Sequence, residues 1–405
     1  MGFTYYTDNI VITKFYKNGV SMDYKKLNEI IVSMRRELHK IPEVGTELPQ
    51  TKSYVMSKLK ELGLKPKECK KDSGLVCDIG DRNSKNIVAI RADMDALPIC
   101  EETRFDYAST NGNMHACGHD AHMACLIGAA HYLLENKNKL KGTVRLVFQT
   151  AEELAIGAKN LINDGLLDGV KAIVGTHVGT IATDVPNGEF VIQEGPLMAS
   201  YDKIIIKIVG KGSHGAYPHS GVDPVLTASQ VVQGIYNIKS REIIATDPIV
   251  ISICMINGGS QYNIIPSEVV LEGTFRTFSE ENRKYIADRI KEISESIAYA
   301  NRAKAEVEII WGCPPVINDK NIVNQLNEVC KQLGFKKALP FAPSMGGEDF
   351  SEYLQNIPGV FIFFSTPTKK NIPHHNSKFE INESKLYQAS VLMSEWAIKY
   401  LGENK

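Results

Sequence analysis

Residues 86–98 read NIVAIRADMDALP, a short apolar run that ends in a loop with two aspartates. The run 86–92 has the length and composition of a strand that is buried on both faces of a sheet. Residues 143–149 and 171–176 repeat this pattern, and residues 119–135 have the periodicity of a helix. Strands that alternate with helices are typical of sheets covered by helices. The sequence therefore predicts an α/β fold built on a mixed, mostly parallel sheet flanked by helices.

The pattern changes between residues 198 and 311. Within this stretch, residues 203–209 (KIIIKIV) alternate Lys with Ile, as expected for a strand with one solvated face, and resemble a sheet edge. After residue 311 the α/β pattern returns, so the stretch has the size and character of an inserted α+β domain. We predict a catalytic domain formed by residues 1–197 and 312–405, an insertion of residues 198–311, and, within the first part, an N-terminal extension of residues 1–21 whose role the sequence does not reveal.

Composition excludes several classes of protein. Lys and Arg number 46 and Asp and Glu 47 in 405 residues, so there is no basic surplus for binding nucleic acid. The apolar runs are far shorter than the ~20 residues that a membrane span needs, and no signal peptide is recognisable at the N-terminus. Eight cysteines are too few for a disulfide framework. We therefore expect a cytoplasmic enzyme that binds neither nucleic acid nor membrane.

Metal-binding residue types are densest in residues 114–122 (MHACGHDAH), which hold three histidines, a cysteine and an aspartate. The segment precedes a predicted helix and follows a predicted strand, where α/β sheets bind ligands. Cys and His are ligands of Zn, Mn, Co or Ni, and a thiolate can bridge two ions. Alternatively, this is a polar loop in which Asp120 stabilises the helix N-terminus. We favour a metal site.

Adjacent carboxylates, Glu152 and Glu153, follow the predicted strand 143–149. In a metal hydrolase one such carboxylate holds a metal, and its neighbour takes a proton from metal-bound water. The alternative is that both only stabilise the start of the next helix.

Histidines follow two further predicted elements. His177 comes directly after the strand 171–176, and His374 and His375 lie in a loop before the last helix. A single histidine at the end of a strand is often structural. Here, however, three successive predicted strands are each followed by residues of a type that binds metal, and His177 follows the third. The histidine pair either completes the coordination of a metal or lies in a solvated turn.

These segments together resemble the dinuclear metallopeptidase family of aminoacylases and glutamate carboxypeptidases. The closest likeness is to the amidohydrolase branch with hippurate hydrolase, N-acyl amino acid deacylases and auxin-conjugate hydrolases. The likeness covers the chain from about Met22 to its C-terminus. It is carried by RRELHKIPEVGTEL, IRADMDALPI, MHACGHDAHMA, FQTAEEL, GTHV, GKGSHGAYPHSGVDP, GSQYNIIPSE, GTFRTF, GGEDF and HNSKF, in this order. It implies a zinc-peptidase-like catalytic domain with an inserted lid and dimerisation domain.

The resemblance implies a role for particular residues of the catalytic domain. Glu152 corresponds to the general base, and Asp95 to an aspartate that orients a metal ligand. His375 stands four residues before Phe379, as the family's last ligand does, so it is preferred over His374. The implied metal ligands are Cys117, shared between two ions, His119, Glu153, His177 and His375.

In the insertion, His214 matches a histidine that reaches an active site, often that of the partner subunit, and stabilises the tetrahedral oxyanion. Asn263 and Arg276 match positions associated with the free carboxylate of the substrate. The chemistry supports Arg276, because a guanidinium binds a carboxylate through two hydrogen bonds. The alternatives are a histidine that stabilises a turn and an arginine on the surface of a strand.

The chain departs from the family near the predicted base. It has Thr150 and Ser377 where the family commonly has proline, and residues 154–157 (LAIG) where the family has a glycine-rich run. None of these changes removes a proposed ligand or Glu152. We therefore expect an active enzyme whose substrate choice is open.

The resulting hypothesis is a metal-dependent amidohydrolase that cleaves N-acyl amino acids with two divalent ions, Mn or Zn being favoured over Co or Ni. The substrate is a small molecule with a free carboxylate, and the protein is a homodimer or a higher homo-oligomer. A carboxypeptidase or dipeptidase with the same chemistry is the main alternative. A thiol hydrolase with Cys117 as nucleophile, and a binding protein that has lost catalysis, are the others.

Overall fold

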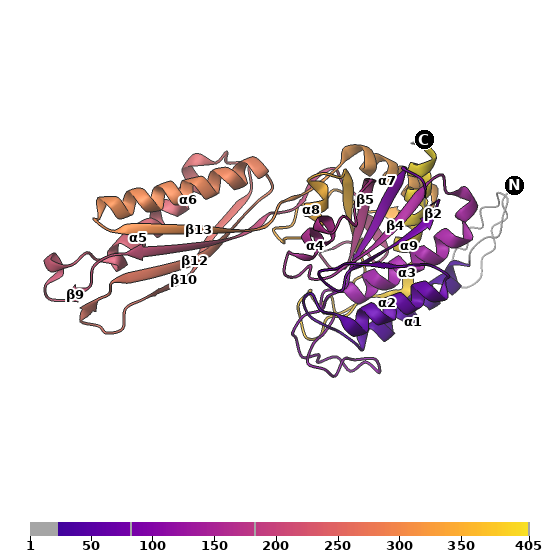
Figure 1. The fold of residues 1–405 in the computed structure, drawn as a ribbon, viewed down its shortest axis with the longest axis horizontal. Coiled ribbons are helices and arrows are strands. Elements are labelled where there is room, and N and C mark those ends of the chain that lie inside the picture. Colours follow the sequence, from indigo (N-terminus) through magenta and orange to yellow (C-terminus); the bar gives the residue numbers. More distant parts are fainter. Residues whose placement is uncertain (1–22, 82, 182–183, 404–405) are drawn as a thin grey trace.

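The structure is a computed structural model that describes residues 23–81, 83–181 and 184–403, so the predicted extension over residues 1–21 lies outside the described residues. The molecule is elongated and has two lobes (Figure 1). We call residues 201–313 the smaller lobe and the other described residues the larger lobe. The larger lobe contains both the first and the last helix, so the chain leaves it and returns.

An eight-stranded mixed sheet forms the centre of the larger lobe, which confirms the predicted fold class. The four central strands are parallel, whereas two outer pairings and the pairing of β16 with β6 are antiparallel. The order is β1 (Lys67–Glu68), β2 (Leu75–Gly80), β4 (Thr143–Gln149), β3 (Ile87–Asp93), β5 (Val170–Gly179), β16 (Gly359–Ser365), β6 (Glu189–Val191) and β15 (Lys336–Lys337).

Helices cover both faces of this sheet (Figure 1). In β3, Val88 and Ile90 face one hydrophobic core and Ala89 faces another, as expected for a strand buried on both sides. No helix in the described part of the chain is long and apolar enough to cross a membrane. The first core includes α1 (Tyr24–His39), α2 (Pro49–Glu61), α3 (His119–Glu135), α7 (Lys320–Gln332) and α9 (Tyr387–Glu403), and the second α4 (Gly157–Asn163) and α8 (Phe350–Leu354).

Strand β5 is longer than the sequence predicted. It continues to Gly179 because its hydrogen bonds to β16 extend as far as the pairing of Gly179 with Ser365. His177 therefore lies within the strand, opposite Phe363, and does not follow the strand as predicted.

The smaller lobe is an antiparallel sheet of order β10-β12-β8-β13 with two helices on one face. Ile204, Ile206 and Ile208 face the helices, whereas Lys203 and Lys207 lie on the other face. The edge position expected for residues 203–209 is wrong, since β8 is hydrogen-bonded to β12 and to β13. The elements are β8 (Tyr201–Val209), α5 (Pro224–Asn237), β10 (Ile249–Gly258), β12 (Glu268–Thr277), α6 (Glu280–Ala300) and β13 (Lys304–Cys313).

Two small sheets complete the fold. One lies in the larger lobe near the junction and the other lies at the far end of the smaller lobe (Figure 1). Their strands are β7 (Gly195–Met198) with β14 (Val316–Asn318), and β9 (Ser213–His214) with β11 (Ile264–Ile265); short helical turns cover Lys137–Lys139, Pro218–Ser220, Ile238–Glu242 and Glu383–Lys385.

A buried histidine joins α1 to the start of α3. His39 Nδ1 lies 2.6 Å from an Asp120 carboxylate oxygen, and His39 Nε2 lies 3.2 Å from Glu101 Oε1. Burial lowers the pKa of His39, but Asp120 and Glu101 outweigh this effect and raise it above 6.5. Burial raises the pKa of Glu101, but the hydrogen bonds from His39 and Thr103 lower it to about 2.

We predict that the His39→Gln variant loses most stability in weakly acidic solution. Protonated His39 stabilises the fold below about pH 6.5 and stops doing so as the pH rises through its raised folded pKa. Ionised Glu101 stabilises the fold above about pH 4.5 and stops doing so as the pH falls toward 2. In urea unfolding, the free energy of unfolding of the variant should therefore be about 3 kcal/mol below that of the wild type between about pH 4.5 and about pH 6.5. At higher pH the difference should be smaller. The exposed His219→Gln variant is the control, and an equal loss at all pH values would contradict the prediction.

Candidate metal centre

The residues with metal-binding side chains meet at the carboxyl ends of the central parallel strands, the usual place for a site in an α/β sheet. Cys117 Sγ, a nitrogen of His119 and an oxygen of Glu153 all lie within 4.8 Å of one another. Cys117, His177 and His374 form a second such group, so Cys117 belongs to both.

Hydrogen bonds leave one nitrogen of His119 and one of His177 free to bind a cation. His119 Nδ1 lies 2.8 Å from the Asp95 carbonyl oxygen, and His177 Nδ1 lies 2.8 Å from that of Val178. Because a carbonyl can only accept, each Nδ1 carries a hydrogen, and Nε2 is the nitrogen of each ring that can bind a metal in place of a proton. His119 Nε2 is buried without a hydrogen-bond partner, and His177 Nε2 lies 3.4 Å from Cys117 Sγ. Metal-bound histidines are commonly oriented in this way.

The same reasoning argues against His122 and His374 as ligands. The Val178 N–H donates to His122 Nε2 at 2.9 Å, and the His122 Nδ1–H donates to Asp93. The Thr180 N–H donates to His374 Nε2 at 3.1 Å, which occupies the lone pair of that nitrogen. Both rings therefore hold the backbone of β5 in place, although His374 lies close to Cys117 and His177.

His375 lies beside the first group of donors. Its Nε2 is 3.2 Å from Glu153 Oε1, and its backbone N–H donates to the Ala116 carbonyl at 2.9 Å. The residue has a left-handed backbone with φ of 60°, which turns its side chain toward Glu153 while His374 points to β5. The structure thus places all five predicted ligand residues in one cluster.

The electrostatics of the cluster favour a bound cation. Burial lowers the pKa of His119, yet Asp93, Asp95 and Glu153 raise it to about 10, so without metal a proton supplies the positive charge that these carboxylates require. Burial, together with Glu153, raises the pKa of the Cys117 thiol well above 9. Divalent metal would replace these protons, since binding to Cys and His releases them. The donor set therefore fits a thiolate- and imidazole-ligated metal centre.

Glu152 is held in a tight turn beside this cluster. The N–H groups of Glu152 and Glu153 donate to the two carboxylate oxygens of Asp95 at 3.0 and 3.1 Å. Ala151 and Ala155, on either side, have left-handed φ angles of 49° and 56°, an uncommon conformation for residues other than glycine. Burial and the neighbouring carboxylates, Glu348 before Glu153, raise the pKa of Glu152 well above 4.5, a property of general bases.

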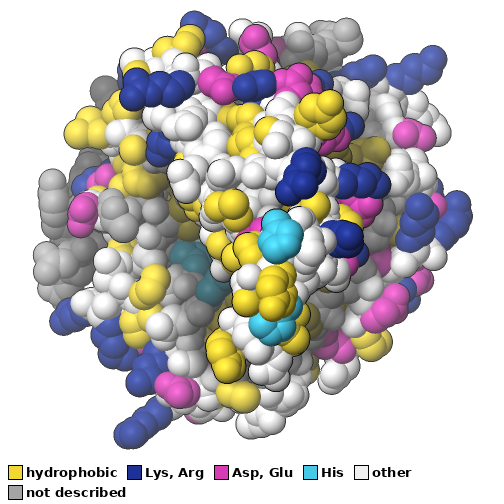
Figure 2. Space-filling view, turned by 90° about the vertical axis from the view of Figure 1, so that its left-hand side faces the viewer, with side chains coloured by type: hydrophobic (Ala, Val, Ile, Leu, Met, Phe, Trp, Pro, Cys, Tyr) yellow, Lys and Arg dark blue, Asp and Glu magenta, His cyan; other side chains and the backbone are white. Residues whose placement is uncertain are grey.

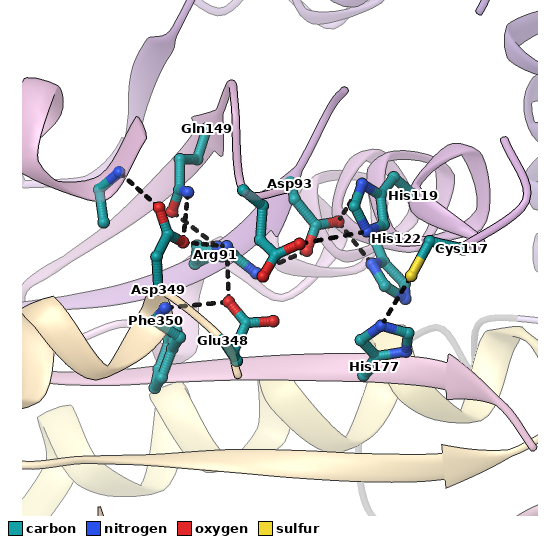
Figure 3. A network of polar contacts seen from close by, with 12 residues as sticks. Arg91, Asp93, Cys117, His119, His122, Gln149, His177, Glu348, Asp349 and Phe350 are labelled. Carbon is teal, nitrogen blue, oxygen red and sulfur yellow. Dashed lines mark hydrogen bonds and ion pairs between the residues drawn. The ribbon is translucent and has the colours of Figure 1, made fainter. Parts of the chain in front are cut away.

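Sequence reasoning missed a buried network around Arg91 (Figure 3). The Arg91 guanidinium donates to Asp93, Glu348 and Asp349 at 2.6 to 3.0 Å, and to Gln149 at 2.9 Å. Burial raises the pKa of Glu348 to about 8 and that of Asp349 to about 7, despite the nearby guanidinium. The signal was the GGEDF stretch (residues 346–350), which contributed to the family resemblance but whose Glu348 and Asp349 were given no role. Glu348 and Asp349 lie within 4.8 Å of Glu152, so the network surrounds the predicted base.

The three predicted residues of the insertion do not join the cluster. His214 lies in β9, at the end of the smaller lobe remote from the larger lobe (Figure 1). Asn263 is its neighbour, because its carbonyl accepts the Gly215 N–H at 2.8 Å. Arg276 lies near the lobe junction, where its Nη1 donates to the Met345 carbonyl at 2.8 Å. Viewed from its remote end, the smaller lobe presents histidine and hydrophobic side chains together (Figure 2).

Comparisons with known proteins agree with this geometry. Residues 89–399 match the peptidase family M20/M25/M40. The chain is 39% identical to the N-acetyl-L-cysteine deacetylase of Bacillus subtilis (strain 168), over 98% of this chain and 94% of that protein. It is 35% identical to thermostable carboxypeptidase 2 of Saccharolobus solfataricus, over 93% of this chain and 97% of that protein. A Bacillus subtilis structure described as a dinuclear metal-binding peptidase of the M20 family aligns with a TM-score of 0.82 and 36% identity, over 93% of this chain and 99% of that one.

We predict that the Arg91→Met variant loses about 3–5 kcal/mol of stability, because removal of the guanidinium leaves buried carboxylates without a partner. Urea unfolding of the metal-free protein measures this loss. The Lys58→Met variant is the control, since Lys58 forms an exposed ion pair with Glu61 that contributes less than about 1 kcal/mol. Equal stability of the two variants would contradict the importance of Arg91.

Proposed function

The chain belongs to the peptidase family M20/M25/M40 and is a metal-dependent hydrolase of amide bonds, and on that premise we propose that it cleaves N-acyl amino acids. The products are a carboxylic acid and a free amino acid. The observation that carries the proposal is the cluster of metal-binding side chains around Cys117, beside Glu152. The similarity to a deacetylase of an N-acyl amino acid supports this substrate class.

We propose that two divalent ions are held by Cys117, His119, Glu153, His177 and His375, with Cys117 common to both. The orientation of His119 and His177 supports this assignment, because a backbone carbonyl holds Nδ1 of each ring and leaves Nε2 as the metal-binding nitrogen. When bound, such ions polarise the amide carbonyl and bring the pKa of water close to neutrality. Mn or Zn is favoured over Co or Ni, although mixed thiolate, imidazole and carboxylate ligands admit all four.

In this mechanism Glu152 is the general base. It removes a proton from the attacking water and later delivers a proton to the nitrogen of the departing amino acid. Asp95 acts through the backbone, because its two hydrogen bonds fix the turn that carries Glu152 and Glu153. The substrate's free carboxylate is assigned to Arg276 at the lobe junction, because a guanidinium can donate two hydrogen bonds to a carboxylate. Asn263 lies beside His214, so as a second contact it would come, like His214, from the partner subunit.

The alternatives have unequal support. A carboxypeptidase or dipeptidase would use the same residues, and the similarity to thermostable carboxypeptidase 2 favours it as the second candidate. A Cys117 nucleophile is disfavoured, because burial raises the pKa of its thiol and reactive cysteines need a lowered one. A binding protein without catalysis is disfavoured by the Glu152 turn, which Asp95 holds in place.

We propose that the smaller lobe, predicted as the insertion over residues 198–311, is a lid and dimerisation domain. His214 would then stabilise the oxyanion in the active site of the partner subunit. The position of β9, remote from the metal centre of the same chain, supports a role in a second copy (Figure 1).

We predict that Glu152→Gln binds metal and substrate as the wild type does, but lowers kcat by about 10²–10⁴-fold, the usual contribution of a general base. The measurement is amino acid release from N-acetyl, N-benzoyl and dipeptide substrates, with chelated protein before and after addition of Mn, Zn or Co. Metal content is determined in parallel. The ranking of the substrates separates a deacylase from a peptidase.

Glu153→Gln is the matched control, because it removes a proposed ligand and should therefore lose metal. Retained activity in Glu152→Gln would contradict the assignment of Glu152 as the general base. Wild-type protein that binds no metal and releases no amino acid would overturn the proposed function itself.

We predict that the inactive variants Glu152→Gln and His214→Ala restore activity to each other when mixed and allowed to exchange subunits. In a hybrid dimer one site combines the intact Glu152 of one subunit with the intact His214 of the other. Random exchange should give about a quarter of the wild-type activity, from half of the dimers and one site in each. Glu152→Gln mixed with Asp95→Asn is the control, because both changes lie in the larger lobe. An active monomer by sedimentation would contradict the proposal.

A further inference from the structure

Three exposed hydrophobic side chains lie next to the proposed base. In the described part of the larger lobe, five large hydrophobic residues are exposed, and three of them, Val44, Leu154 and Ile156, flank Glu152 and Glu153 in sequence or in space. Leu154 is 55% exposed and directly follows Glu153. Its Cδ1 atom lies 3.7 Å from the position that a Cβ atom on Gly45 would occupy, so the segment with Val44 lies against it. We call Val44, Leu154 and Ile156 the apolar rim.

The rim is held rigidly in its exposed position. The Ala155 N–H donates to the Glu152 carbonyl at 2.8 Å and closes the turn that contains Leu154. The left-handed backbones of Ala151 and Ala155 cost free energy for residues with a Cβ atom. Beyond the turn, the Ala158 N–H donates to Asp349 at 3.1 Å. A leucine that is fixed in solvent by such contacts, beside the reacting groups, has the features of a ligand-binding residue.

We infer that Val44, Leu154 and Ile156 form the wall of a subsite for the acyl group, and that the substrate carries an apolar acyl group larger than acetyl. This inference rests on the proposed function. The amino acid end of the substrate is a poor fit, because its carboxylate requires a cation and Val44, Leu154 and Ile156 supply none. The acyl end has no charge and gains up to about fourfold in affinity for each methylene group that an apolar wall removes from water.

The test compares two series of substrates with metal-loaded protein. One series varies the acyl group of N-acyl-alanine from acetyl through butanoyl to hexanoyl and benzoyl. The other keeps acetyl and varies the amino acid from alanine to methionine and phenylalanine. The wild type should prefer hexanoyl over acetyl in kcat/KM, and Leu154→Ser should reduce that preference at least about tenfold. The ratios within the amino acid series should not change.

Leu339→Ser is the matched control, because Leu339 is an 86% exposed leucine of the larger lobe outside the rim. If Leu154→Ser loses metal through its neighbour Glu153, Ile156→Ser makes the same comparison, and a preserved hexanoyl preference in it overturns the inference. A change in the kcat/KM ratios that is confined to the amino acid series also overturns the inference. An equal fall in kcat/KM for every substrate overturns it as well. Wild-type protein that cleaves no member of either series contradicts the proposed function, whereas cleavage with unchanged ratios in the variants contradicts only the acyl subsite.

Discussion

The buried guanidinium of Arg91 is the interaction on which the site depends. It joins β3 to residues 348–349, which lie more than 250 positions later, and to Gln149 at the end of β4. One guanidinium cannot balance all the carboxylates around it, and burial of an unpaired charge is costly. The remaining excess surrounds Glu152 and Glu153, where the pKa of Glu152 is raised and His119 is protonated. This excess of buried negative charge destabilises the metal-free protein and therefore favours the binding of divalent cations.

A segment of the larger lobe, residues 344–349, connects the smaller lobe to the surroundings of the proposed base. Residues 344–349 run from the lobe junction, where the Met345 carbonyl accepts from Arg276, to Asp349. Asp349 in turn accepts from the Ala158 N–H, just beyond the turn that carries Glu152. A rotation of the smaller lobe thus acts on a segment that contacts the surroundings of the base.

The sequence predicted the parts of the site that follow from local pattern. Apolar runs located the strands, and ligand-type residues at strand ends located Cys117, Glu153 and His177 in one cluster. The role of Arg91 could not be found in this way, because Gln149, Glu348 and Asp349, three of its four partners, are remote in sequence. The preference for His375 over His374 came from the family pattern. The structure supports it independently, because the Thr180 N–H donates to His374 Nε2 and so occupies the lone pair of that nitrogen. The prediction that residues 203–209 form an edge strand was wrong, because the alternation of Lys and Ile indicates which face of the strand is solvated. It does not indicate which strands are its neighbours.

The shape of the smaller lobe limits how His214 can act. Strand β12 runs from Glu268, at the end near β9, to Thr277, at the lobe junction, and ten residues of strand span about 30 Å. A rotation about the junction keeps each atom of the lobe at its original distance from the junction. The metal centre lies next to that junction, because Glu348 and Asp349 closely follow Met345. A rotation of the lobe about the junction therefore does not bring His214 to the Glu152 of its own chain, which favours the proposed action of His214 on a second copy.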